Sequence, residues 1–143
     1  MNPLALDAFA PPRGWRYIFP WPPSNNRYYR HLTKGRLAGR TLISKNGREY
    51  REMVYARVAE QGRPVQPLSG RLRLEVHAYP PDARKRDLSN LTKCLEDSLV
   101  RAGVMVDDSQ IDQLYLERRP KDAPFGRVEV LVLPLPEPKG ACD

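Results

Sequence analysis

The sequence predicts a single α/β (α+β) domain with one mixed β-sheet and two helices, in the order β-α-β-α-β-β. Residues 70–80 alternate between apolar and polar side chains, which is typical of a strand with one buried face. Residues 88–102 repeat leucine at helical spacing, so a helix should follow that strand. A chain of 143 residues suits one domain, which we expect over 15–135, between flexible extensions at 1–14 and 136–143.

The N-terminal part is expected to hold a strand, an irregular segment and a helix. The strand covers residues 15–20 and ends at the prolines that follow it. Residues 24–44 show little periodicity and should form either a long loop or an irregular hairpin. A helix is expected over 44–62, with Gly62 as its stop. Its predicted buried face consists of Tyr50, Met53, Val54 and Val58.

The C-terminal part supplies the remaining strands and the second helix. The strand at 70–80 should turn four residues toward the core: Leu72, Leu74, Val76 and Ala78. The leucine-rich helix should end at Gly103. Two further strands are expected at 113–119 and 127–135, and the proline, aspartate and glycine residues between them predict a turn.

The charge is positive and unevenly distributed. The chain has 24 Lys and Arg residues against 17 Asp and Glu, a net charge of +7. From Arg13 to Arg57 there are eleven basic residues and two acidic ones, so this segment alone carries +9 and the remainder is net acidic. A polyanionic partner, nucleic acid first, is favoured over an ordinary basic protein.

Cysteine usage and hydropathy exclude several classes of protein. Cys94 and Cys142 belong to no CxxC or Cys/His cluster, which argues against structural zinc or a disulfide scaffold and favours a reducing compartment. No apolar run approaches the length of a membrane span, and the N-terminus is not a persuasive secretion signal. We therefore expect a cytoplasmic protein with no membrane partner.

Acidic residues flank the second helix, with a lysine between them. Asp87 comes at its start, and Asp107 and Asp108 follow its end. Capping of the helix is the simpler role for Asp87. If the chain crossing brings Asp87 and Asp108 together, however, they form a hard oxygen site suited to Mg²⁺. Lys93 would then be a cation that offsets charge developing on a phosphate, rather than a solvated surface lysine.

Basic and aromatic residues provide candidates for contacts with nucleic acid. Arg84, Lys85 and Arg86 immediately precede Asp87, a pairing that suits an anionic substrate. Aromatic residues between the arginines near position 30 could stack on exposed bases or pack in the core. The other candidates for contacting DNA are Arg27, Tyr29, Arg30, Lys34, Arg36 and Arg40.

Two segments resemble the RusA family of Holliday junction resolvases. "FPWPPSNNRYYRH" (19–31) is similar to the family's N-terminal signature. "RKRDLSNLTKCLEDSLVRAGVMVDDSQ" (84–110) is similar to its catalytic signature, R-R-D-x-D-N-x-x-K followed by a helix, A-G and D-D-x-Q. The resemblance implies a homodimer, often encoded by prophages, that cuts four-way DNA junctions in opposed strands.

The resemblance also implies roles for single residues. Asp87 and Asp108 match metal-binding aspartates, and Lys93 matches the active-site lysine. The expected cofactor is Mg²⁺, with Mn²⁺ as an alternative. Asn90 and Asp107 also match positions of the motif, but we rank their functional roles below those of Asp87, Asp108 and Lys93.

Ser89 departs from the family, because the signature has a metal-binding aspartate at this position. It stays a candidate catalytic residue, since its hydroxyl could hold a metal-bound water. Three hypotheses follow. The chain works with two aspartates, more slowly or at higher Mg²⁺ concentration. Another acid replaces the missing one, the nearest in sequence being Asp82, Asp107 and Asp112. Or the chain binds junctions without cutting them. A module that binds RNA or single strands is the remaining alternative.

Overall fold

A four-stranded mixed sheet forms the centre of the molecule. The computed structural model describes residues 14–136. The sheet has the order β1-β6-β4-β5, and β4 pairs parallel with β5 and antiparallel with β6, which also pairs antiparallel with β1. The strands are β1 (Trp15–Pro20), β4 (Leu72–Tyr79), β5 (Ile111–Arg118) and β6 (Arg127–Pro134). The predicted α+β class, the mixed sheet and the order of the elements are confirmed.

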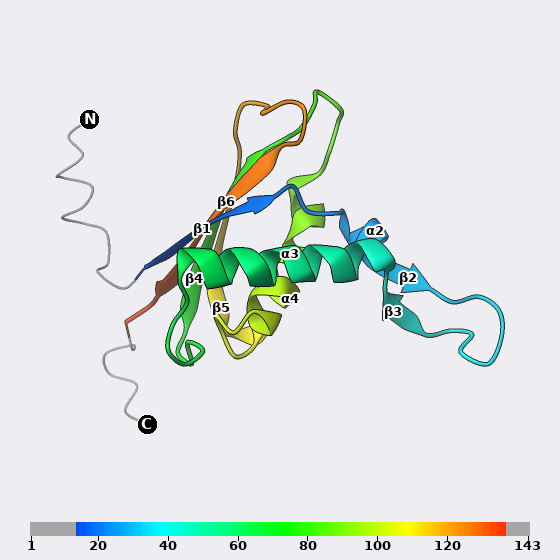
Figure 1. Cartoon of the computed structure of the whole chain (residues 1–143), viewed down its shortest axis with the longest axis horizontal. Coiled ribbons are helices and arrows are strands. Elements are labelled where there is room, and N and C mark those ends of the chain that lie inside the picture. The colour runs from blue at the N-terminus through cyan, green and yellow to red at the C-terminus, as the bar shows by residue number, and fades with distance from the viewer. Residues whose placement is uncertain (1–13, 137–143) are drawn as a thin grey trace.

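Two helices pack on the sheet and close the core. They are α3 (Lys45–Gln61) and α4 (Thr92–Arg101), and α3 runs across the sheet in Figure 1. The inward residues of β4 are buried as predicted, since apolar side chains at alternate positions share one face of the strand. The same core contains Val54 and Val58 of α3 and Leu95 and Leu99 of α4. Gly103 follows the C-terminal end of α4 and has a φ of 82°, a conformation that favours glycine.

The segment 24–44 forms an irregular hairpin, one of the two predicted alternatives. A short helix, α2 (Asn25–Tyr28), leads into β2 (Tyr29–His31), which pairs antiparallel with β3 (Thr41–Ile43). Residues 29–43, called the arm below, project from the body of the molecule (Figure 1). These strands were not predicted because each is only three residues long, which is too short for a recognisable alternation of side chains.

Two local predictions need correction. Met53 was expected on the buried face of α3, but its side chain is 44% exposed because the buried stripe follows Tyr50, Val54 and Val58. The second helix does not begin as an α-helix at Leu88. A 3-10 helix, η1 (Leu88–Leu91), precedes α4, with the Asn90 N–H donating to the Asp87 carbonyl at 3.1 Å.

The predicted extensions at 1–14 and 136–143, together with Arg13 and Cys142, lie almost entirely outside the described residues. Within residues 14–136, no helix has both the length and the apolar character needed to cross a membrane.

Candidate functional site

Lys93 and Asp108 form an ion pair between two elements. Lys93 lies in the first turn of α4, and Asp108 begins the 3-10 helix η2 (Asp108–Gln110). The Lys93 Nζ atom lies 3.1 Å from Asp108 Oδ2. The hydrogen bond and the negative charge of Asp108 raise the pKa of Lys93, with a smaller contribution from the nearby Tyr29 phenol. The ammonium group therefore stays charged at neutral pH.

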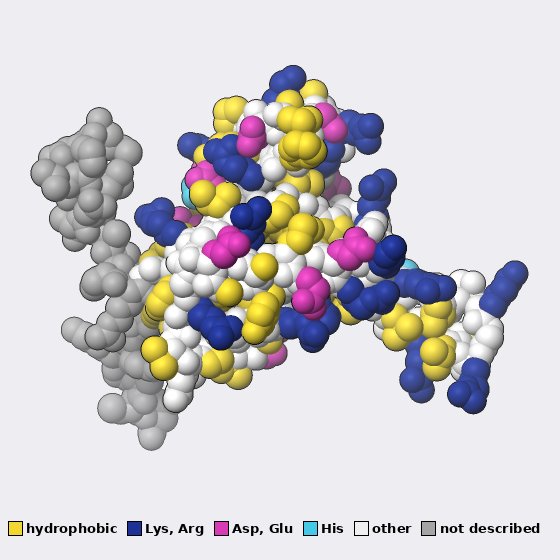
Figure 2. Space-filling model, in the orientation of Figure 1, with side chains coloured by type: hydrophobic (Ala, Val, Ile, Leu, Met, Phe, Trp, Pro, Cys, Tyr) yellow, Lys and Arg dark blue, Asp and Glu magenta, His cyan; other side chains and the backbone are white. Residues whose placement is uncertain are grey.

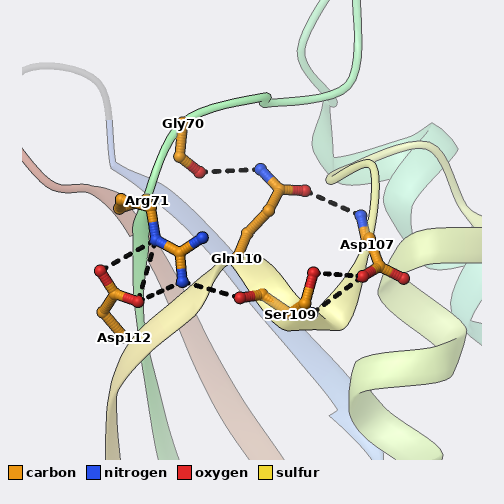
Figure 3. Close-up of polar contacts among 6 residues, drawn as sticks. All are labelled: Gly70, Arg71, Asp107, Ser109, Gln110 and Asp112. Carbon is orange, nitrogen blue, oxygen red and sulfur yellow. Dashed lines mark hydrogen bonds and ion pairs between the residues drawn. The ribbon is translucent and has the colours of Figure 1, made fainter.

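Gln110 fixes the loop that carries Asp108 (Figure 3). Its side chain is 7% exposed and makes four hydrogen bonds to the backbone. The oxygen Oε1 accepts from the N–H groups of Val106 and Asp107 at 2.8 and 2.7 Å. The nitrogen Nε2 donates to the carbonyls of Leu68 and Gly70, both at 2.8 Å. One buried amide thus joins the acidic loop to the segment that enters β4.

Sequence reasoning from composition did not single out Gln110, although the D-D-x-Q part of the catalytic signature contains it. Asp107 completes the arrangement as the N-cap of η2, where its carboxylate accepts from the Ser109 N–H at 3.2 Å. The hydrogen bonds from Ser109 lower the pKa of Asp107. Asp107 therefore orders the loop that carries Asp108.

Asp87 lines the wall of a cavity of about 780 Å³. Its side chain is exposed and makes no capping hydrogen bond, so the helix-capping role expected for Asp87 is not observed. Arg84, Lys85 and Asn90 line the same cavity, and Arg27 lines it from α2. The N-terminal and catalytic signatures therefore meet at one place, although more than fifty residues separate them in sequence.

The basic residues before Asp87 differ in their freedom. Arg86 donates to Asp82 Oδ1 at 2.6 Å, and its guanidinium lies 5.7 Å from the centre of the Trp21 ring. The hydrogen bonds from the Arg86 guanidinium and from the Arg84 N–H lower the pKa of Asp82 to about 2. The Arg84 side chain is 81% exposed and lies farther from Asp82, with 3.8 Å between its Nε and Oδ2, and Lys85 is also exposed. Arg86 is thus held in place, while Arg84 and Lys85 have room to meet an anion.

Ser89 is exposed, and its carbonyl accepts a hydrogen bond from the Thr92 hydroxyl at 3.0 Å. The three acids named as replacements for the missing aspartate already have other partners. Asp82 binds Arg86, and Asp107 caps η2. Asp112 accepts from Arg71 at 2.9 Å, and Arg71 also donates to the Ser109 carbonyl at 2.8 Å (Figure 3).

Two acids that sequence reasoning missed lie on α4 near Asp108. Burial raises the pKa of Glu96 and Asp97, and the negative charge of Asp108 raises both further. Asp97 also accepts from the Tyr28 hydroxyl and lies 3.5 Å from an Arg51 guanidinium nitrogen. Their helical spacing from Lys93 was the available signal, but only the fold reveals their distance from Asp108.

The candidate ligands match Mg²⁺ in donor chemistry, because carboxylate oxygens are hard donors and this ion retains several waters. The exposed, uncapped carboxylate of Asp87 has oxygens free to bind an ion. Among residues 14–136, however, no three His, Cys, Asp or Glu side chains are grouped as a metal site. The residues present therefore suit an ion that takes further oxygen from water and from a bound phosphate.

Besides Tyr29, the arm carries four basic candidate DNA-binding residues and no acidic residue: Arg30, Lys34, Arg36 and Arg40. Figure 2 shows Lys and Arg side chains along this projection. The two tyrosines at its base differ. Tyr28 is fully buried, whereas Tyr29 is half-buried, and the two rings meet edge to face at 4.9 Å. Tyr29, not Tyr28, is therefore the aromatic side chain near Lys93.

The fold and this site define a small α+β protein in which acidic residues and a charged lysine adjoin a basic surface. The model of the family described as endodeoxyribonuclease RusA matches residues 20–132. The chain belongs to the RusA family of endodeoxyribonucleases.

Relatives from bacteria and a phage match over most of their length. The crossover junction endodeoxyribonuclease RusA of Escherichia coli (strain K12) is 38% identical over 113 residues, covering 79% of this chain and 88% of the relative. The crossover junction endodeoxyribonuclease of Enterobacteria phage 82 is 39% identical over 118 residues, covering 82% and 92%. The predicted family is thus confirmed, and the relatives' names support the predicted class of enzyme, an endodeoxyribonuclease.

Proposed function

We propose that this protein resolves four-way (Holliday) DNA junctions by paired, symmetric cleavage of phosphodiester bonds. The observation that carries the proposal is the ion pair between Lys93 and Asp108, two residues of the catalytic signature. Its second support is the cavity that joins Asp87 to the N-terminal signature. The names of the relatives, which act on crossover junctions, agree with it.

Each site residue has a distinct role in the proposed reaction. Asp87 and Asp108 would hold Mg²⁺, or alternatively Mn²⁺, which supplies an activated water and polarises a phosphoryl oxygen. Lys93 keeps its proton and offsets the negative charge that grows on the phosphate during cleavage. Gln110 holds the loop so that Asp108 and Lys93 keep their relative positions.

The DNA backbone is bound by side chains outside the acidic site. On the arm these are Arg30, Lys34, Arg36 and Arg40, and beside the cavity they are Arg27, Arg84 and Lys85. Contacts of this kind position a substrate without reading its sequence. Arg86 acts through its bonds to Asp82 and its position over Trp21, which order the loop before Asp87. Tyr29, whose phenol lies near Lys93, is the aromatic candidate for a contact with DNA.

A homodimer fits the proposed substrate, since a four-way junction has near two-fold symmetry and is cut in two opposed strands. The apolar residues of α4 are mostly buried in the core, which favours the last strands as the interface. Leu114 and Tyr115 of β5 are 45% and 40% exposed and are the best candidates. A cytoplasmic location and a prophage origin are part of the same proposal.

A junction-binding protein with weak or absent cleavage is the second candidate, because Ser89 stands where the family has a metal-binding aspartate. A symmetric junction labelled in each strand separates the two. Paired nicks with Mg²⁺, lost in Asp87→Asn, support the enzyme. Tight binding of the junction over duplex and single strands without nicks supports the binding protein. Equal binding of all three nucleic acids would contradict both.

A further inference from the structure

We propose that the cavity beside Asp87 receives one unstacked nucleobase from the strand whose phosphate lies at the candidate active site. This inference rests on the proposed function and names a part of the substrate that the site would recognise. The cavity has a volume of about 780 Å³, within the range of about 300–1,000 Å³ for pockets that hold small organic ligands.

The cavity is built from three segments that are distant in sequence. The loop before α2 contributes Trp21, the N-terminal half of α3 contributes Asn46 and Met53, and the catalytic signature contributes Asp87 and Asn90. Because Asp87 is part of its wall, a phosphate bound near Asp87 places an adjoining nucleotide at the cavity.

The chemistry of the walls suits a flat ring with polar edges. Prolines and two larger side chains, Trp21 and Met53, provide apolar surface. The amides of Asn46 and Asn90 offer both donors and acceptors, which can pair with the edge of a base. Arg84 and Lys85 at the same cavity provide positive charge for the backbone of a nucleotide. A purely apolar ligand would leave these polar groups without partners.

Two exposed features indicate that this surface is not simply core. Met53 is a large apolar residue, yet its side chain is 44% exposed. Trp21 is half-buried, and Arg86 lies over its ring. Extruding a base costs least where pairing is already disturbed, as at a branch point. A base pocket would therefore favour a junction over an intact duplex.

The test measures junction binding without divalent metal, so that no cleavage intervenes. Met53→Trp fills the cavity, and Tyr55→Trp is the matched control, since Tyr55 is 46% exposed on the same helix but does not line the cavity. Met53→Trp should weaken binding of the intact junction about tenfold, the magnitude of one lost base contact. Tyr55→Trp should bind as the unaltered chain does.

The second half of the test changes the DNA: an abasic nucleotide is placed in turn on each side of the cleaved phosphate. At one of these positions, the abasic junction should restore Met53→Trp to within about twofold of the unaltered chain, because no base remains to be excluded. An abasic nucleotide several positions away should restore nothing. Asn46→Trp, at an exposed position of the same cavity, should repeat the pattern.

Two outcomes overturn the inference: Met53→Trp binds the intact junction like Tyr55→Trp, or its defect persists on every abasic junction. Failure of the proposed function looks different. In that case the unaltered chain itself shows no preference for the junction over duplex DNA.

Discussion

The Lys93 ammonium group lies 3.1 Å from Asp108 Oδ2, although fifteen residues separate the two in sequence. The crossover from β4 through α4 to the parallel strand β5 creates this pair, because it returns the chain to the start of α4. The two residues come from the two parts of the segment that resembles the catalytic signature. One part supplies the cation and the other the carboxylate, and the helix between them sets the distance.

Removing the charge at Lys93 should impair cleavage more than binding. In the Ser89→Asp background, we expect Lys93→Met to lower the junction cleavage rate about 100-fold, the usual effect of removing one group that stabilises transition-state charge. Junction affinity should change by less than about threefold, since most binding comes from other phosphate contacts. Lys45→Met, at an 81% exposed lysine of α3, is the control and should cleave normally. Equal effects of the two changes would contradict the role of Lys93.

Gln110 should be important for both stability and the loop that holds Asp108. Gln110→Leu removes four hydrogen bonds and leaves the Asp107 N–H and the Gly70 carbonyl without their side-chain partner, while the Val106 N–H still donates to the Leu68 carbonyl at 3.2 Å. We therefore expect a loss of about 2–4 kcal/mol in the free energy of unfolding. Denaturant titration measures it. Gln113→Leu, at an exposed position of β5, should cost less than about 0.5 kcal/mol. A Gln110→Leu protein as stable as this control would show that the observed hydrogen bonds do not hold the loop.

The arm should bind phosphates through charge alone. Arg36→Ala should weaken junction binding and reduce the slope of log affinity against log salt concentration by about one unit. The same change is expected for Lys34→Ala and Arg40→Ala. Arg57→Ala is the matched control, since Arg57 is 52% exposed on α3 and pairs with Glu60. If the arm variants keep the full slope, the arm does not contact the backbone.

Cys94 should be chemically inert in the folded protein. Its side chain is fully buried, and burial raises the pKa of its thiol to about 12, so almost no thiolate forms at neutral or mildly alkaline pH. In a Cys142→Ser chain, a thiol reagent at pH 8 should react about 1,000-fold more slowly before unfolding than in denaturant. Rapid labelling of the native protein would show that α4 is not packed as described.

The regular elements could be predicted from the sequence because their side-chain patterns are strong. The alternation in β4 and the leucine spacing of α4 both identify a buried face that the structure confirms. The arm was harder, since strands of three residues carry too little pattern to separate a hairpin from a loop. Met53 was misplaced because it adjoins the buried stripe of α3 without belonging to it.

The site was predictable in composition but not in its contacts. The signature identifies Asp87, Lys93 and Asp108, but the pairing of the last two depends on how β5 returns beside β4. The neighbouring acids Glu96 and Asp97 also needed the fold, because their distance from Asp108 through space decides how far its charge raises their pKa. Buried polar groups such as Gln110 find partners across the chain, which local patterns do not encode.

The most direct test is the rate of junction cleavage against Mg²⁺ concentration, for the unaltered chain, Ser89→Asp and Asp87→Asn. We predict paired nicks that require Mg²⁺, a lower Mg²⁺ requirement and a faster rate in Ser89→Asp, and no cleavage in Asp87→Asn with junction binding retained. If the unaltered chain does not cleave but Ser89→Asp does, the unaltered chain is a junction-binding protein instead. Cleavage that survives Asp87→Asn, or no cleavage even in Ser89→Asp, would contradict the assignment of the site.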